Sequence, residues 1–380
     1  MQKKIIALAI AGLSSAAFAQ TNVTISGNID LGYQNVNTQT AAAGKDTQQS
    51  WVGNGSSTST LVFSGTEDLG GGMKAGFLLA SDYTAGAQQA SGVGATTVPA
   101  AANAPFVNQM FNSQNYLMLS GNFGTFKFGT VNHTSLEAEM GAQPFGTAIG
   151  SGVSAAFSRL NGIGTAGNIF NNTANATGGA RMVRAGQSMK YDTPTFSGFT
   201  GTYNHVFKND NDQYSSVGMQ EFGLKYNNGP ANVWLTTTKL DSGNNTMGVA
   251  GAATAITQSV TKHNIIAGNY TFGPATVYAG WTSSKQDLAA GNSVDARSWN
   301  IAVKYAVSGA LSLAANVLRV DDKRVTDVDR NLNALGVDYS LSKRSTAYVR
   351  YETGDNDKGG VTGNNTGAFT RWAVGARHTF

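Results

Sequence analysis

The most regular feature of the chain is an alternation of apolar and polar side chains over segments of about ten residues. In the first such segment the apolar residues share one parity: Val23, Ile25, Ile29, Leu31 and Tyr33. Polar residues, from Asn22 to Asp30, take the other parity. Because successive side chains of a strand point to opposite faces, each segment predicts a strand with one apolar and one polar face. Helical spacing is not sustained anywhere after residue 20, so the pattern predicts an all-β protein.

Sixteen segments of this kind follow one another along the chain. Their approximate centres are residues 28, 62, 77, 116, 127, 187, 203, 222, 235, 267, 280, 302, 315, 336, 349 and 375. Short links rich in Gly, Asn and Pro alternate with long polar stretches, at about 35–57, 83–111, 132–180, 241–260 and 352–368. Tight turns at one end and long loops at the other are typical of an up-and-down barrel in an outer membrane.

The first residues of the chain have the pattern of a secretory signal. Lys3 and Lys4 precede an apolar stretch, which is followed by the small-residue pattern Ala17-Phe18-Ala19. A short membrane anchor is the alternative, but the apolar run is shorter than the ~18 residues that a spanning helix needs. We therefore expect residues 1–19 to be a signal peptide and residues 20–380 to form one β-barrel domain outside the cytoplasm.

Composition decides between a soluble sheet and a membrane sheet. Only 13% of residues are charged, whereas soluble domains have about 25%, and the chain contains 47 Gly. A soluble sandwich of this length would need a charged exterior, but here Tyr, Trp and Phe occupy the apolar parity near strand ends. A sheet in hydrocarbon must close on itself, and sixteen strands enclose a water-filled interior. The sequence predicts a sixteen-stranded antiparallel transmembrane β-barrel with an aqueous pore.

Several function classes are disfavoured by the same composition. With 26 basic and 22 acidic residues the formal net charge is +4, so no nucleic-acid partner is expected. The absence of Cys removes disulfides and thiol chemistry, and the four His are scattered, so we expect neither a metal nor another cofactor. Residues 162–167 fit the G-x-G-x-x-G pattern, but no strand precedes them and no helix follows, as a dinucleotide site requires.

Five segments carry a family resemblance. They run from Val23 to Asp30, Ser64 to Ala75, Ser120 to Thr125, Met189 to Phe199 and Val374 to Phe380. In these segments, which follow one another from residue 23 to the end, the chain resembles the general trimeric porins of Gram-negative bacteria, especially the β-proteobacterial branch. The terminal Phe380 resembles the carboxy-terminal aromatic signal that the outer-membrane assembly machinery reads.

The resemblance implies a homotrimer of barrels in the outer membrane, in contact with lipid and lipopolysaccharide, through which small hydrophilic solutes and ions pass passively. It also implies that the third long loop, about 132–180, folds inward and forms a constriction. This loop contains Gln143-Pro144-Phe145-Gly146, where the family has a similar Pro-Phe-Gly stretch. A mobile surface loop is the alternative for this stretch.

The charges expected to line the pore are only partly those of the resembled family. Aligned on the shared segments, Thr60 and Ser113 stand where that branch usually has arginines, whereas Arg184 matches the arginine that follows the inward loop. Further basic candidates on the polar parity include Lys74, Lys127 and Lys190, and the loop adds Glu137, Glu139 and Arg159. Basic side chains slightly outnumber acidic ones on this parity, so we expect a weak preference for anions.

Two other classes of function remain as alternatives to a diffusion porin. A substrate-selective channel of the same architecture is the nearer one, since the aromatic residues of the loops are too dispersed to decide. An outer-membrane esterase would need a nucleophile beside a base, and the sequence supplies no such arrangement. We therefore expect the chain not to be an enzyme.

Overall fold

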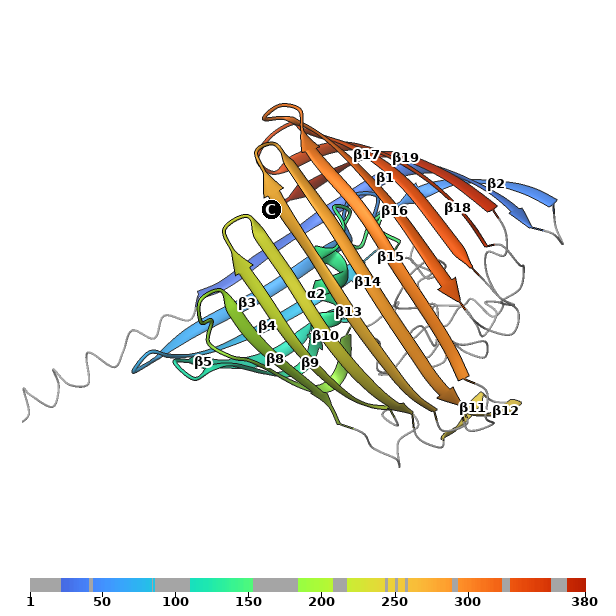
Figure 1. Ribbon diagram of the computed structural model, residues 1–380. Helices are drawn as coiled ribbons and strands as arrows, with labels where there is room; N and C mark the ends of the chain where they lie inside the picture. The colour runs from blue at the N-terminus through green and yellow to red at the C-terminus, as the bar shows by residue number, and fades with distance from the viewer. Residues whose placement is uncertain are drawn as a thin grey trace, which may run out of the picture.

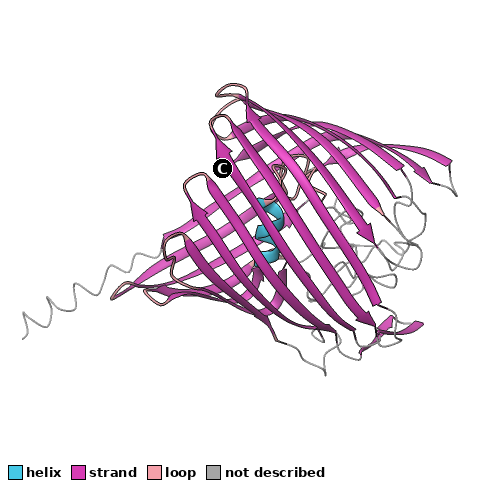
Figure 2. Cartoon of the chain, in the orientation of Figure 1, coloured by secondary structure: helices cyan, strands magenta, loops and turns pink. Residues whose placement is uncertain are grey.

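The computed structural model describes residues 22–40, 44–83, 85, 110–152, 184–207, 217–242, 245–249, 252–256, 259–288, 293–322, 329–356 and 368–380. In these ranges the chain consists mainly of strands, which surround a single short helix (Figure 2). The expected signal peptide, the expected loop residue Arg159 and the glycine pattern at 162–167 lie outside the described residues.

The strands in chain order are β1 (Asn22–Thr40), β2 (Gly44–Val52), β3 (Ser59–Gly70), β4 (Met73–Tyr83), β5 (Asn115–Gly121), β6 (Gly124–Asn132), β7 (Arg184–Asp192), β8 (Phe199–Val206), β9 (Val217–Asn228), β10 (Ala231–Ser242), β11 (Asn245–Val249), β12 (Ala252–Ile256), β13 (Ser259–Phe272), β14 (Ala275–Leu288), β15 (Ser293–Ala306), β16 (Leu311–Asp322), β17 (Arg330–Ser340), β18 (Ser345–Asn356) and β19 (Ala368–Thr379). The helix is α2 (Thr134–Gly141), between β6 and β7.

The strands form a closed ring of antiparallel neighbours (Figure 1). The ring closes where β1 pairs with β19. The other edge of β1 pairs with β3 over residues 22–28 and with β2 over residues 32–40, so β2 and β3 together occupy one strand position. The short strands β11 and β12 form a separate hairpin. The barrel therefore has the predicted sixteen strands, and the sixteen predicted centres all fall within them.

The two parities of β15 have the predicted environments. The side chains of Trp299, Ile301 and Val303 are exposed, whereas those of Ser298 and Asn300, on the other parity, are buried. A ring of strands with exposed apolar side chains on its outside and polar ones inside is the inverse of a soluble protein. This arrangement suits a barrel that has hydrocarbon outside and water inside.

Two stretches that we expected to be loops contain strands. Most of residues 35–57 belongs to a hairpin in which β1 continues to Thr40 and pairs with β2, and residues 245–256 contain β11 and β12. In the first hairpin both parities are largely polar, for example Gln34, Asn37 and Thr47. A strand without an apolar face shows no alternation of apolar and polar residues, so the hydrophobic pattern could not reveal it.

The described residues include one short helix, α2, which the hydrophobic pattern of the sequence does not reveal. Five of its eight residues are buried: Thr134, Ser135, Leu136, Ala138 and Glu139. A short helix surrounded by protein on several sides has no single apolar stripe, so the sequence shows no helical period there. None of the helices in the described ranges is long and apolar enough to span a bilayer.

Candidate pore-lining site

Helix α2 and the residues that follow it lie inside the ring, against the inner faces of β9, β10 and β13 (Figure 1). Ala138 and Ala142 pack with Leu240 and Ile265, which face inward from β10 and β13. Trp234 of β10 packs against the same cluster. It lies so close to Gly141 that a Cβ atom there would be 2.4 Å from the indole ring, so this approach requires glycine.

The N-terminus of α2 is held by a carboxylate from the barrel wall. Glu221 of β9 accepts backbone N–H bonds from Thr134 at 2.6 Å and Ser135 at 3.2 Å, and it also accepts the hydroxyl of Ser135. The preceding residue, His133, makes no side-chain cap. A carboxylate satisfies the free N–H groups of the first turn and interacts favourably with the helix dipole. Glu221 therefore fixes the helix to β9.

Three inward asparagines hold the backbone of the segment as it continues along the wall. The side-chain N–H groups of Asn269 on β13, Asn300 on β15 and Asn316 on β16 each donate to a backbone carbonyl. Their acceptors are the oxygens of Gly141 at 3.0 Å, Ala142 at 2.6 Å and Gly150 at 2.9 Å, respectively. Each bond satisfies a backbone group that no strand pairs, so the three together fix the path of residues 141–150.

The far end of the described segment is attached to β18. The backbone N–H of Gly150 donates to Glu352 at 2.7 Å, and the same carboxylate accepts Arg371 Nε at 2.7 Å. The guanidinium of Arg350 lies over the Phe145 ring at 5.5 Å and pairs with Asp338 at 2.7 Å. The segment thus follows the inner wall of the ring from β9 to β18.

A cluster of three lysines and two acids lies where α2 faces β6, β7 and β9. Glu137 of α2 pairs with Lys190 at 2.6 Å and Lys225 at 3.1 Å, whereas Asp192 lies 3.6 Å from Lys127 and 3.7 Å from Lys225. Lys190 is only 1% exposed, so its charge depends on Glu137 for compensation. Among these five side chains the positive charges outnumber the negative ones by one, and Glu221 of β9 also lies within electrostatic reach of Lys190.

The ionisation of Glu137 follows from this cluster. Burial alone would raise its pKa, but the ammonium groups of Lys190 and Lys225 and their hydrogen bonds act in the opposite direction. The net effect is a pKa of the Glu137 carboxyl below its usual value. Glu137 is therefore ionised at neutral pH, and the cluster stays charged.

Three of the predicted pore residues come together at a second place on the wall. Arg184 Nη1 donates to Asp82 at 2.9 Å and to Ser113 Oγ at 2.5 Å. Thr60 is the register partner of Asp82 across β3 and β4, and its hydroxyl accepts Asn28 Nδ2 at 2.9 Å. The one arginine at this place is thus paired with an acid, and the two neutral residues Thr60 and Ser113 lie beside that pair.

Of the predicted residues that the structure describes, Lys74 and Glu139 remain. Lys74 is the second residue of β4, next to the short turn at residues 71–72, and Glu139 is buried on α2. The prediction missed Asp192 and the three asparagines. Asp192 follows Lys190 by two residues and so shares its parity, which is a signal that could have identified it. No group of three or more potential metal ligands occurs in the part of the chain that the structure describes.

Known proteins match both the sequence and the barrel fold of this chain. The family model described as Gram-negative porin matches residues 6–359. The chain belongs to the Gram-negative porin family. Outer membrane porin protein 32 of Delftia acidovorans is 28% identical over 92% of this chain and 88% of its own length. The major outer membrane protein P.IB of Neisseria gonorrhoeae is 25% identical over 92% of each chain.

Solved structures agree with the fold of this porin. The anion-selective porin from Comamonas acidovorans superposes with a TM-score of 0.74 at 24% identity, covering 95% of this chain and all of that one. OmpT of Vibrio cholerae superposes with a TM-score of 0.64 at 16% identity over 95% of this chain. The family and these relatives place the porin in the outer membrane.

Proposed function

We propose that this porin is a diffusion channel: a water-filled pore that passes small hydrophilic solutes and ions, with a weak preference for anions. The observation that carries the proposal is the inner face of the closed barrel, which holds ion pairs of Lys, Arg, Asp and Glu together with buried Asn, Ser and Thr side chains. No arrangement on that face is built around one solute in the described ranges; its charged groups are mostly paired with each other.

We further propose that the segment of residues 132–180 is the constriction of the pore. In support, its described part, up to residue 152, is bonded to β9 through Glu221 and to β18 through Glu352. A segment bound at both places occupies space within the lumen and reduces its cross-section. Arg159, which we expect on the same segment, would add a positive charge to it.

The proposed anion preference follows from the charges that the lumen leaves uncompensated. The lysine cluster has one excess positive charge, whereas Arg184 with Asp82, and Arg350 with Asp338, are balanced pairs. A single excess charge in a wide aqueous pore biases ion passage without excluding either sign. The structural relative from Comamonas acidovorans is itself anion-selective, which supports this sign.

Planar-bilayer recording of the purified porin tests the proposal. We expect the conductance to be ohmic and to rise in steps. In a KCl gradient, the reversal potential should have the sign that corresponds to a modest preference for anions. Liposomes that contain the porin should swell in small sugars at rates that fall smoothly with sugar size. Clear cation preference would contradict the proposed selectivity, and block by one solute at micromolar concentration would favour a substrate-selective channel.

The assembly that we propose is a homotrimer, exported by a signal peptide at residues 1–19 and recognised by the assembly machinery through Phe380. In support, one solved structure with this fold is a trimer form of OmpT from Vibrio cholerae. The exposed end of β19, with Phe380 facing outward, suits recognition before the barrel closes. Native mass spectrometry of the detergent-extracted porin should give the mass of three chains, each beginning at Gln20.

A further inference from the structure

The chain between β2 and β3, residues 53–58, interrupts the regular wall of the barrel, and we call it the β2–β3 link. Strand β1 pairs with β3 up to residue 28 and with β2 from residue 32 onward. Between these two ladders, the three residues 29–31 of β1 lie opposite the seven residues 53–59. The surplus residues cannot stay in the plane of the sheet, so the link must fold to one side of it.

The β2–β3 link folds toward the lumen. Ladders continue on both sides of it, so it lies within the height of the wall, where irregular backbone is tolerated only inside protein or beside a water-filled cavity. The backbone N–H groups of Ser56 and Ser57 both donate to Oδ2 of Asp30, each at 2.6 Å. Asp30 is fully buried on the polar parity of β1, which faces inward. The link therefore crosses the inner side of β1.

The carboxylate of Asp30 fixes the position of the link. Besides the two N–H groups on Oδ2, its Oδ1 accepts the hydroxyl of Tyr348, which faces inward from β18, at 2.6 Å. Ser59 replaces the missing strand partner, because its Oγ accepts the backbone N–H of Asp30 at 2.9 Å. A Cβ atom on Gly55 would collide with the Tyr348 ring, so this close approach requires glycine. Hydrogen bonds to a carboxylate are roughly twice as strong as neutral ones, so Asp30 holds the link firmly.

The link also contacts the segment that follows α2. The backbone N–H of Ile149 donates to the carbonyl of Asn54 at 3.4 Å, and the hydroxyls of Thr58 and Thr147 are 3.0 Å apart. That segment follows the inner wall from β9 to β18, and β18 is separated from β1 only by β19. The link therefore extends the inner layer of chain past β1 to β3.

We propose that the β2–β3 link is a second constriction element of the pore and that Asp30 is its positioning residue. The link contains only Gly, Asn, Ser and Thr; Asn54 is exposed, whereas Ser56, Ser57 and Thr58 are half-buried. Its surface toward the solute is thus polar and uncharged, so the link limits the size of the solutes that pass and not the sign of their charge. This inference rests on the proposed diffusion function.

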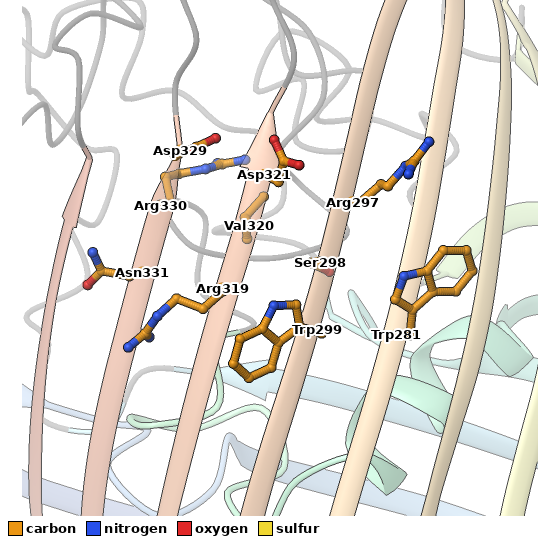
Figure 3. A pocket seen from close by; sticks show the side chains of 10 residues that line it. All are labelled: Trp281, Arg297, Ser298, Trp299, Arg319, Val320, Asp321, Asp329, Arg330 and Asn331. Carbon is orange, nitrogen blue, oxygen red and sulfur yellow. The ribbon is translucent and has the colours of Figure 1, made fainter.

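Cysteine labelling tests whether the link lines the pore, since the chain has no Cys of its own. The test variant is Asn54→Cys, which keeps the backbone contact to Ile149. The matched control is Arg297→Cys, on the same face of β15 as the exposed Trp299 (Figure 3). The Arg297 side chain is 59% exposed, so a water-soluble reagent should reach it. With 2-sulfonatoethyl methanethiosulfonate we expect a stepwise loss of single-channel current in Asn54→Cys and no loss in Arg297→Cys.

Mass spectrometry of the recovered protein shows whether each cysteine has reacted. A labelled Asn54→Cys that keeps its full current would overturn the proposal. An Asn54→Cys that stays unlabelled while Arg297→Cys reacts would overturn it as well, because a residue that lines the lumen must be accessible. Asn54→Cys removes no bond of the Asp30 carboxylate, so this variant should fold as the wild type does.

Liposome swelling tests the positioning role of Asp30. In Asp30→Ala the two N–H groups of the link lose their acceptor, and each lost bond to a charged group lowers the population of the bound position about tenfold. We expect this variant to admit sugars larger than the largest that the wild type passes. Asp30→Asn should restore the wild-type size limit, because its amide oxygen can still accept both N–H groups.

The outcomes separate this inference from the proposed function. An equal size limit in wild type and Asp30→Ala would overturn the role of Asp30, and so would an Asp30→Asn that is as permeable as Asp30→Ala. A wild type that passes neither ions nor sugars would contradict the diffusion function itself. A conducting wild type whose Asn54 and Asp30 variants behave like it would contradict only the second constriction element.

Discussion

The carboxylate of Glu221, in the barrel wall, accepts the backbone N–H of Thr134, the first residue of the helix inside the pore, at 2.6 Å. The two residues are 87 positions apart in the chain. A barrel strand thus supplies the N-terminal cap that the helix lacks in its own sequence.

Removing this cap should loosen the helix from the wall. In Glu221→Ala the first N–H groups of α2 lose their acceptor, which costs about 1–2 kcal/mol of local stability. We expect single-channel currents with more open-channel noise, while the heat stability of the barrel changes little. Glu221→Gln keeps one acceptor oxygen and should lie between wild type and Ala. An Ala variant with currents as quiet as wild type would show that the helix is held by other contacts.

Charge changes within the lysine cluster should alter ion preference in opposite directions. Lys225→Gln removes a positive charge that Glu137 and Asp192 share, so anion preference should fall, whereas Glu137→Gln should raise it. The interaction of an ion with one charge about 4 Å away in water is about 1 kcal/mol, which predicts a change in permeability ratio of up to about fivefold. Reversal potentials in a KCl gradient measure the ion preference of each variant. A shift of the same sign in the two variants would contradict this assignment.

The pH dependence of that preference follows from the lowered pKa of Glu137. Because the folded pKa lies below the unfolded value, the ion pair stabilises the folded state above the unfolded pKa, about 4.3 for a free Glu. That contribution is lost only as pH falls through the lower folded value. We therefore expect wild type and Glu137→Gln to keep different reversal potentials as pH falls past about 4.3. If the reversal potentials of wild type and Glu137→Gln became equal already near pH 5 or above, the lowered pKa of Glu137 would be refuted.

The asparagines on the inner wall should control the path of the segment after α2. In Asn300→Ala the carbonyl of Ala142 loses its donor, and an unsatisfied buried carbonyl costs about 1–3 kcal/mol. We expect the residues around Ala142 to become accessible to proteases added to the reconstituted porin. Asn264→Ala, on the outward face of β13, is the matched control and should leave the cleavage pattern unchanged. Similar protection in both variants would exclude Asn300 as an anchor.

The barrel could be predicted from the sequence because each strand has lipid on one side and the lumen on the other. Each strand therefore shows its own local alternation of apolar and polar residues. The alternation around Trp299 and Ile301 is enough to place β15 and to assign its faces. The hydrogen bond between Asn300 and Ala142 could not be predicted in this way, because Ala142 lies 158 residues earlier in the chain and no local pattern relates the two residues. The interior site depends on such long-range pairs and on an eight-residue helix without a one-sided stripe. The alternation predicted that most of the charged residues of this site face the lumen, but it could not predict which of them form ion pairs with each other.

The two ends of the barrel sheet meet along β1 and β19, and Gly27 and Phe380 add a final backbone pair to that ladder. Gly27 and Phe380 exchange backbone hydrogen bonds at 3.2 and 3.0 Å, and a Cβ atom on Gly27 would lie 2.2 Å from the backbone oxygen of Thr60. The circle that begins at β1 is therefore completed only by β19, the strand farthest from it along the described chain. Until it arrives, two strand edges lack partners, and hydrocarbon does not tolerate such edges. Insertion of this chain must consequently be a late, cooperative event, in which the polypeptide is delivered whole before the lipid can accommodate it.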